Sequence, residues 1–242
     1  MTTLFISDLH LDEAKPAIGE QFLQFLGRDG WSAEALYILG DLFESWIGDD
    51  DPNPHYAGMK SAIRHCVESG TRVYFMHGNR DFLVGERFAD ETGVAILPDP
   101  SVVELYGDRV MLSHGDALCT DDFEYQQVRA MTRNPEWQSM MLSKSLRERK
   151  DVAERARTQS QARNAMLPEH IMDVNQEAVE QAMRNNGVAL LLHGHTHRPA
   201  IHEFELDGKR ATRIVLGDWY DQGSVVRWDE KGFKIEALPR PA

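Results

Sequence analysis

Seven side chains that can bind metal ions follow short apolar segments of the chain. They are Asp8, His10, Asp41, Asn79, His114, His195 and His197. Together they offer imidazole nitrogens, carboxylate oxygens and one amide oxygen, a mixture that manganese, zinc or iron(II) accepts. Magnesium or calcium alone would favour oxygen ligands throughout. These residue types predict a site for transition-metal ions, with solvated histidines in a turn as the simpler alternative.

The number of these ligands predicts two metal ions rather than one. A single ion takes about four to six ligands, so seven suit a pair of ions if a carboxylate bridges them. Asp41 is the expected bridge, because its two oxygens can be shared between cations. Two metals about 3.5–4 Å apart are the usual arrangement for displacement at phosphorus. The set therefore predicts an enzyme that cleaves a bond to phosphorus.

Five apolar segments precede these ligands, and each is typical of a β-strand covered on both faces. The segments are "TLFIS", "ALYILG", "RVYFMHG", "RVMLS" and "VALLLHG". Helical patterns over residues 17–28 and 57–69 suit the crossovers that parallel strands require. Ligands of such sheets gather outside the carboxyl ends of the strands. The pattern therefore predicts an α/β fold with one site at the strand ends.

The spacing of the paired ligands has a geometric reason. In an extended segment, residues i and i+2 point the same way, so Asp8 with His10, and His195 with His197, can face one site. His193 has the same parity but lies where the strand should still be packed, so we expect a core or supporting histidine. Three glycines adjoin the ligands, where turns need unusual dihedral angles or room near the metals: Gly40, Gly78 and Gly194.

Composition narrows the class of protein. The 242 residues are 42% hydrophobic and 27% charged, which is ordinary for a soluble globular protein. No apolar run approaches the roughly 18–20 residues that span a bilayer, and no signal-peptide pattern is visible, so we expect a cytoplasmic protein. Cys66 and Cys119 are expected to be reduced core residues. The net charge of −13 disfavours nucleic acid as a partner.

Residues 121–170 contain none of these ligands and instead show a mostly helical pattern. Between Arg129 and Arg163 there are nine Lys or Arg against four Asp or Glu, interleaved with apolar residues such as Trp137, Met140 and Met141. Such a surface suits contact with anionic lipid. The alternative is a helical pair that packs on the core with a solvated charged face.

The five motifs together resemble those of the calcineurin-like metallophosphoesterases, in order and with suitable gaps over almost the whole chain: "DLH", "GDLFE", "GNRD", "SHGD" and "HGHTH". Longer stretches are similar to one branch, the UDP-2,3-diacylglucosamine diphosphatases of bacterial lipid A biosynthesis: "LYILGDLFESWIGDDDPNP", "HGNRDFL", "HGDALCTDD", "IMDVN" and "HGHTHRPA".

The resemblance implies a fold, a reaction and a location. The fold is a four-layer αββα sandwich with residues 1–120 and 171–242 as its core and residues 121–170 as an inserted helical cap. The reaction, with two Mn²⁺ as cofactors, cleaves the diphosphate of UDP-2,3-diacylglucosamine into UMP and 2,3-diacylglucosamine 1-phosphate (lipid X). A hydroxide held between the ions would attack the uridine-side phosphorus. The expected location is the cytoplasmic face of the bacterial inner membrane, with peripheral attachment; the oligomeric state stays open.

The resemblance also implies roles for individual residues. One ion lies among Asp8, His10, Asp41 and His197, and the other among Asp41, Asn79, His114 and His195. The residues assigned to catalysis are Asp41, Asn79, Arg80 and His114. Substrate contacts fall on Asn79, Arg80, Asp122, Ser160, Asn164 and His195. The family often has lysine where this chain has Leu167, and Arg163 is a candidate to grip a phosphate in its place.

Arg80 favours a diphosphate substrate on physical grounds. Many metallophosphoesterases have histidine at this position, which can protonate an alkoxide leaving group. Arginine cannot serve as an acid near neutral pH, but it can hold phosphate oxygens with two hydrogen bonds. A phosphate monoester, with a second pKa of about 6, leaves without that proton. The alternative for Arg80 is a surface salt bridge to Asp81.

Other residues are expected to support the site or the core. Asp81 and Asp116 are expected to orient ligand histidines. Residues 211–242 are expected to form short strands that close the sheet, in which Asp218 is structural and Trp219 and Trp228 pack. Two rival functions remain: a metallophosphoesterase for another nucleotide, phosphoprotein or nucleic acid, and a non-catalytic module with structural metals. Structural sites tend to be closed and rich in sulfur, unlike this set.

Overall fold

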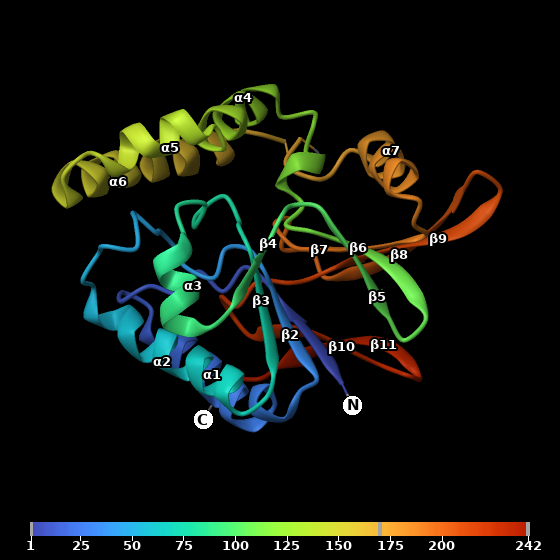
Figure 1. Ribbon diagram of the computed structural model, residues 1–242. Helices are drawn as coiled ribbons and strands as arrows, with labels where there is room; N and C mark the ends of the chain where they lie inside the picture. Colours follow the sequence, from blue (N-terminus) through green and yellow to red (C-terminus); the bar gives the residue numbers. More distant parts are fainter. Residues whose placement is uncertain (1, 169–170, 241–242) are drawn as a thin grey trace.

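The computed structural model describes residues 2–168 and 171–240, in two β-sheets packed face to face (Figure 1). The six-stranded sheet has the order β11-β10-β1-β2-β3-β4, and the five-stranded sheet has the order β5-β6-β7-β9-β8. The strands of the first sheet are β1 (Thr3–Ile6), β2 (Ala35–Leu39), β3 (Arg72–Met76), β4 (Ala95–Leu97), β10 (Gly223–Asp229) and β11 (Gly232–Leu238). Those of the second are β5 (Ser101–Leu105), β6 (Asp108–Ser113), β7 (Leu190–His193), β8 (Ala200–Leu206) and β9 (Lys209–Val215).

Helices cover the outer face of each sheet. The described helices are α1 (Pro16–Arg28), α2 (Pro54–Glu68), α3 (Glu86–Thr92), α4 (Phe123–Thr132), α5 (Pro135–Leu142), α6 (Leu146–Asn164) and α7 (Gln176–Asn186), with short 3₁₀ turns η1 (Gly30–Ser32) and η2 (Asp116–Leu118). Side chains of α1, α2 and α3 pack with the outer face of the six-stranded sheet, and α7 packs on the five-stranded sheet. A third apolar cluster lies between the sheets. The predicted αββα sandwich is confirmed.

The alternation of side chains explains why strands with continuous apolar sequence are buried on both faces. On β1, Leu4 and Ile6 pack toward the helices, whereas Phe5 packs between the sheets. On β2, Leu36 and Ile38 face the helices in the same way. Because successive side chains point to opposite faces, a strand between two apolar layers needs an unbroken apolar run. This is the pattern from which the strands were predicted.

The predicted elements agree with the structure, with one refinement. The five predicted strands are β1, β2, β3, β6 and β7, and the predicted helices correspond to α1 and α2. The carboxyl-terminal strands close two sheets rather than one, because β9 pairs with β7 while β10 pairs with β1. Trp219 and Trp228 are buried packing residues, as predicted. Cys66 and Cys119 are free and buried, also as predicted.

Three helices, α4 to α6, follow one another between η2 and α7 and lie at one end of the sheets (Figure 1). Each begins at a polar residue whose side chain accepts a backbone N–H: Asp122, Asn134 and Ser145. Arg149 of α6 is buried and donates to the carbonyl of Ile47 at 2.6 Å. α6 is thereby held to the loop that follows β2. In the described residues, no helix is both long enough and apolar enough to cross a membrane.

Candidate metal centre

The carboxyl ends of five strands bring the seven predicted ligands to one end of the two sheets. The ends of β1, β2 and β3 come from the six-stranded sheet, and those of β6 and β7 from the five-stranded sheet. Backbone hydrogen bonds join the loops: Asp8 N donates to Gly40 O at 3.1 Å, and Gly194 N donates to His114 O at 2.9 Å. The ligands are therefore positioned by loops that are bonded to one another beyond the strands.

The backbone of five predicted ligands is strained. The φ angles are +56° at Asp8, +52° at His10, +53° at Asp41, +67° at His195 and +57° at His197. Residues with side chains rarely adopt this left-handed region, which costs on the order of 1–3 kcal/mol at each position. Strain of this kind gathers where side chains must be aimed at a ligand. Here it turns the chain so that side chains from both sheets converge.

Asp41 lies between histidines that come from different sheets. Its Oδ2 is 3.9 Å from Nε2 of His10 and 3.8 Å from Nε2 of His114. Its Oδ1 accepts the backbone N–H of Arg80 at 2.8 Å, which fixes the rotation of the carboxylate. One oxygen therefore faces nitrogen ligands on either side, as a bridging oxygen between two cations would.

Two groups of residues have ligand atoms within 4.8 Å of one another. The first is Asp8, His10 and His197, and the second is Asp8, Asp41 and His114. In the first group, Nε2 of His197 is 3.3 Å from Oδ1 of Asp8 and 3.3 Å from Nε2 of His10. The two groups share Asp8 and therefore lie next to each other.

Asn79 and His195 adjoin the second group. Oδ1 of Asn79 is 3.1 Å from Nε2 of His114. The rings of His195 and His114 have centroids 5.0 Å apart. The structure thus brings all seven predicted ligands into one cluster.

The polar atoms of this cluster fit a divalent cation. Among the described residues, the buried atoms Oδ1 of Asp8 and Nδ1 of His10 have no hydrogen-bond partner. Nδ1 of His114 lies 2.9 Å from the carbonyl of Leu39 and donates to it, which leaves Nε2 as the nitrogen that faces the cluster. This is the usual arrangement of a histidine that binds metal through one nitrogen. The donor set and its orientation therefore suit metal ions.

Burial and crowding shift the pKa values of the cluster. Burial raises the pKa of Asp41 to about 7, and burial lowers the pKa of His10 to about 3 and that of His195 to about 4. Burial also acts to lower the pKa of His197, but the nearby carboxylates of Asp218 and Asp8 outweigh it and raise this pKa to about 10. His10 and His195 are therefore neutral at pH 7, whereas His197 is charged and would lose its proton on binding a metal ion. A cation would favour the charged form of Asp41.

Glycines are required where backbone approaches the ligands. A Cβ on Gly78 would lie 2.1 Å from Oδ1 of Asp41, and one on Gly194 would lie 2.3 Å from Oδ2 of Asp8. We expect Gly78→Ala to displace the Asp41 carboxylate, to cost about 1–3 kcal/mol of stability and to weaken metal binding. Urea unfolding and metal analysis measure both effects.

Gly58 is the matched control, because a Cβ there meets nothing within 4 Å and the residue lies within α2. Gly58→Ala should raise stability by about 0.5–1 kcal/mol and leave the metal content unchanged. A Gly78→Ala protein with normal metal content would contradict the placement of Gly78 against Asp41.

Arg80 carries a positive charge at the edge of the cluster, and no described residue forms a side-chain hydrogen bond or ion pair with it. Its Nε is buried and unpartnered. Asp81 is not its partner, because both oxygens of that fully buried carboxylate accept backbone N–H groups, including Leu42 N and Gly78 N at 2.8 Å. The salt-bridge alternative for Arg80 is therefore wrong. A guanidinium left unpaired beside a metal cluster is suited to an anionic ligand.

The hydrogen-bond partners of Asp81 and Asp116, which we expect to orient ligand histidines, include backbone and side-chain groups other than those histidines. Asp81 holds the backbone of the two loops after β2 and β3. Asp116 accepts from the hydroxyl of Tyr125 at 2.7 Å and from Nε of Arg129 at 2.9 Å. Both carboxylates are buried, and Oδ1 of Asp116 has no hydrogen-bond partner among the described residues.

Other residues support the histidines, and sequence reasoning missed these roles. Oδ2 of Asp218 is 3.3 Å from Nδ1 of His197, so this aspartate supports a ligand. Oε2 of the buried Glu44 is 3.6 Å from Nδ1 of His10, and Tyr220 stacks on the ring of His10. The signal was available for Asp218, because "LGDWY" repeats the strand–Gly–Asp pattern. Glu44 lies three residues after Asp41 and gave no separate signal.

His193 lies apart from the cluster, as expected. It is fully buried, and its Nδ1 is 2.9 Å from the carbonyl of Gly194, an acceptor only. Nε2 is 3.3 Å from Nη1 of Arg213 and accepts from it. Burial lowers the pKa of His193 to about 3, so the ring is a neutral core residue.

The predicted substrate contacts of residues 121–170 lie on α4 and α6. Asp122 caps α4 and pairs with Arg163, whose Nη1 is 2.8 Å from Oδ2. Because Arg163 pairs with this carboxylate, it is not an unpaired cation that could bind a phosphate. Ser160 lies half-buried on α6, and Leu167 follows the helix, also half-buried. The side chain of Asn164 lies outside the described part of the structure.

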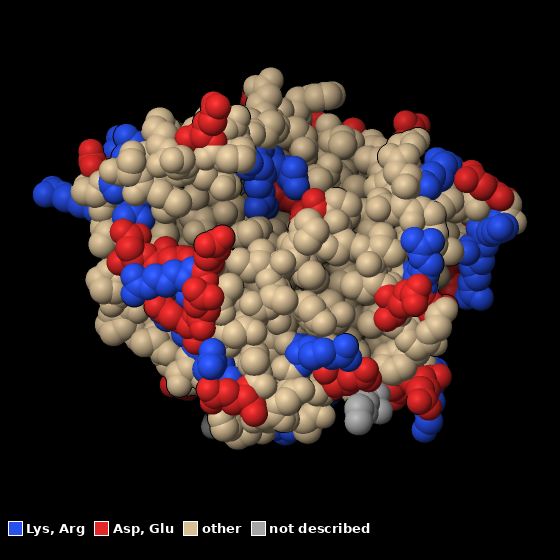
Figure 2. All heavy atoms as spheres, in the orientation of Figure 1, with Lys and Arg blue, Asp and Glu red and all other residues tan. Residues whose placement is uncertain are grey.

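Arg157 of α6, which the sequence did not single out for the site, contacts it indirectly. Its Nη1 is 2.5 Å from Oε1 of Glu44, the carboxylate beside His10. A space-filling view shows Lys and Arg side chains beside a hollow beneath α4 (Figure 2). The helices therefore present cations toward the side of the metal cluster.

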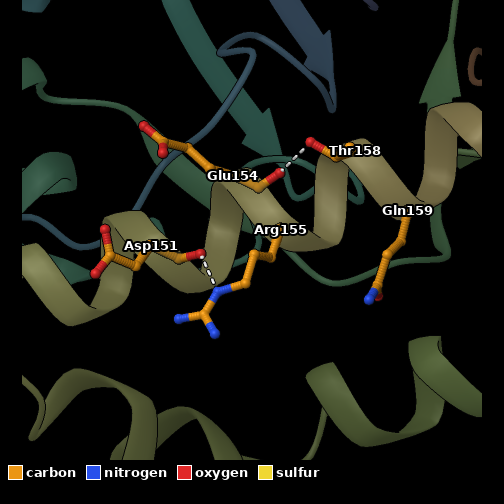
Figure 3. Close-up of a pocket in the computed structure, with 5 residues that line it drawn as sticks. All are labelled: Asp151, Glu154, Arg155, Thr158 and Gln159. Carbon is orange, nitrogen blue, oxygen red and sulfur yellow. Dashed lines mark hydrogen bonds between the residues drawn. The ribbon is translucent and has the colours of Figure 1, made fainter.

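A hollow of about 610 Å³ runs along α6 (Figure 3). All its lining residues belong to that helix: Asp151, Glu154, Arg155, Thr158 and Gln159. None is a predicted ligand, and all five are polar. The lining of this hollow is therefore distinct from the predicted metal ligands.

Known proteins that are similar in sequence to this chain agree with the interpretation of the cluster as a metal centre. The model of the calcineurin-like phosphoesterase family matches residues 1–199. The UDP-2,3-diacylglucosamine hydrolase of Stenotrophomonas maltophilia (strain R551-3) is 51% identical over 99% of this chain and 100% of its own length. The enzyme of the same name from Escherichia coli O7:K1 is 53% identical over 94% of this chain and 95% of its own. The chain therefore belongs to the calcineurin-like phosphoesterases and, among them, to the family of the UDP-2,3-diacylglucosamine hydrolases.

Proposed function

We propose that this metal-dependent hydrolase cleaves the diphosphate of UDP-2,3-diacylglucosamine into UMP and 2,3-diacylglucosamine 1-phosphate. The observation that carries the proposal is the unpaired guanidinium of Arg80 beside a cluster of metal ligands. Relatives that are 51–53% identical over nearly the full chain bear the name of this activity. The unpaired arginine is the anion-binding group that a diphosphate requires. The names of the relatives indicate which diphosphate is the substrate.

The proposed cofactors are two Mn²⁺ ions. Asp8, His10, Asp41 and His197 would hold one, while Asp41, Asn79, His114 and His195 would hold the other. When bound, such ions lower the pKa of water to about 7 and polarise phosphoryl oxygens. The mixture of nitrogen and oxygen donors supports manganese over magnesium.

The remaining chemistry belongs to residues of this chain. Arg80 would hold oxygens of the diphosphate and stabilise the charge that develops on them. Asn79 and His195 would position the same group from the loops after β3 and β7. No proton donor is needed at the leaving group, because a sugar phosphate leaves as a weak base. Attack at the uridine-side phosphorus would release UMP.

We propose that residues 121–170 form a cap for the acylated part of the substrate. Exposed apolar side chains gather on this segment: Phe123, Val128, Met131, Met140, Leu142 and Met166. Flexible methionines conform readily to acyl chains. Asp122, Ser160 and Asn164 are the proposed polar contacts in this segment. The same apolar surface, with the basic residues of α6, would attach the protein peripherally to the cytoplasmic face of an inner membrane.

Hydrolysis by metal-free protein reconstituted with manganese, zinc or magnesium tests the proposal. With acylated UDP-glucosamine, we expect UMP and the acylated sugar 1-phosphate, at the highest rate with manganese. Product identification by mass spectrometry in ¹⁸O-water should place the label in UMP. A reconstituted protein that hydrolyses UDP-glucose or simple phosphodiesters faster than the acylated substrate would favour the alternative, a metallophosphoesterase for another nucleotide or phosphodiester.

A further inference from the structure

A second pocket, of about 210 Å³, lies on the outer face of the five-stranded sheet. Two residue pairs that face each other across the ladder of β8 and β9 form its floor: Ala200 with Val215, and His202 with Arg213. Ala211, on the same face of β9, belongs to the apolar cluster beneath α7. The remaining lining residues are Asp173, Thr196, Arg198 and Pro199. The pocket is thus distinct from the hollow along α6 and contains no predicted metal ligand.

Arg213 is a buried cation that has no carboxylate partner among the described residues. Its exposed fraction is 7%, and its Nε has no hydrogen-bond partner among the described residues. Its Nη1 donates to Nε2 of His193, which is neutral. Burial lowers the pKa of Arg213, and the charge of Asp173 only partly opposes this effect. A buried charge that is not paired is costly, so the free side of this guanidinium favours an anion.

The one carboxylate in the pocket lining already has partners. Oδ2 of Asp173 accepts from Nη1 of Arg198 at 2.9 Å, and Oδ1 accepts from the backbone N–H of Val174 at 2.8 Å. Asp173 therefore neutralises Arg198 rather than Arg213. Arg213 is then the described cation of the lining that no described carboxylate neutralises.

Thr196 adds a second unsatisfied group. Its Oγ1 is buried and has no hydrogen-bond partner in the described structure. Because a hydroxyl can donate, Thr196 and Arg213 can both bind one acceptor group in the pocket. Arg198 and His202 bring further N–H groups to the same space. Four side chains with donors suit the several oxygens of a tetrahedral oxyanion better than the two of a carboxylate.

We propose that this pocket binds a small tetrahedral oxyanion of the phosphate class, either inorganic phosphate or the terminal phosphate of a monoester. The guanidinium of Arg213 neutralises the anion, and Thr196 donates from the loop between two predicted metal ligands, His195 and His197. Arg213 also contacts His193, at the start of the same loop. The occupant would therefore contact the segment that carries two metal ligands from the side opposite the reaction. The inference does not depend on the substrate proposed above.

Calorimetric titration of inorganic phosphate into the manganese-loaded protein tests this site. We expect two classes of binding site in the wild-type protein, one at the metals and one in the pocket. Arg213→Met should lose the second class, with an affinity at least tenfold lower, and keep the first. Arg210→Met is the matched control, since Arg210 is an exposed arginine of β9 paired with Glu203; both classes should remain. A second class that survives in Arg213→Met would overturn the proposal.

Thr196→Val keeps the positive charge of Arg213 and removes only the hydroxyl. This variant tests the proposal if Arg213→Met does not fold. We expect it to weaken the second class by about three- to tenfold, the value of one hydrogen bond. Unchanged binding in Thr196→Val, or a single class of phosphate site in the wild-type protein, would contradict the inference. A parallel titration with UMP identifies the source: tighter binding than inorganic phosphate to the second class indicates a nucleotide monophosphate, and weaker binding indicates the free anion.

Discussion

Replacing Asp41 with asparagine should abolish hydrolysis and metal binding together. The amide keeps the shape of the side chain, and its oxygen can still accept the backbone N–H of Arg80. It lacks the negative charge that two cations would share through Oδ2, the oxygen that faces both His10 and His114. The loss of kcat/KM should exceed the roughly 10–100-fold that is typical of residues that only support ligands. Steady-state kinetics and elemental analysis of the purified protein measure the two effects.

A control for Asp41→Asn is Asp108→Asn, which removes an exposed carboxylate at the start of β6, far along the strand from the ligand His114. Asp108→Asn should keep full metal content and activity. If Asp41→Asn retained both metal ions, Asp41 would not be the bridge. If it retained activity with neither ion bound, the entire assignment of the cluster as a catalytic metal centre would fail.

Arg80→Met should lower kcat/KM by about 10²–10³-fold, which corresponds to about 2.7–4 kcal/mol of transition-state stabilisation. The fold and the metal content should be unchanged, because the guanidinium has no side-chain partner among the described residues and offers no ligand to a metal. Arg80→Lys should recover only part of the activity, since an ammonium group cannot hold two phosphate oxygens in the same planar geometry. Kinetics with acylated UDP-glucosamine, together with thermal unfolding, separate the two contributions.

The matched control for Arg80 is Arg72→Met on β3, because Arg72 is exposed and paired with Glu34. Its loss should change activity little. Arg80→His provides a further comparison: a histidine can protonate an alkoxide, so this variant should gain relative activity on alkyl phosphodiesters while it loses activity on the diphosphate. Equal losses on both substrates would argue against a role of Arg80 in the choice of leaving group.

The sequence predicted the strands and the ligands because both follow from local patterns. β1 and β2 have no polar interruption, since each is covered by an apolar layer on both faces. The ligands follow the strands directly, and the i, i+2 spacing of Asp8 and His10 or of His195 and His197 is visible without a fold. The ligands meet at one site because the carboxyl ends of the strands lie at the same edge of the sheets.

Long-range partners could not be predicted in this way. The sequence did not show that β6 and β7 belong to a different sheet from β1 to β3, because the apolar pattern is the same in both sheets. The contact of Glu44 with His10 depends on the turn that follows β2. The pairing of Asp122 with Arg163 depends on how α4 packs against α6. The hydrogen bonds of Asp116 to Tyr125 and Arg129 likewise depend on how α4 packs against η2. Such contacts depend on packing between segments far apart in the chain.

Anomalous diffraction at the manganese edge, from crystals of the manganese-loaded protein, tests the central claim most directly. The account predicts two peaks about 3.5–4 Å apart, one on each side of the Asp41 carboxylate. His10 and His197 should adjoin one peak, and His114 and His195 the other. A single peak, or ions bound away from the ends of these five strands, would contradict it.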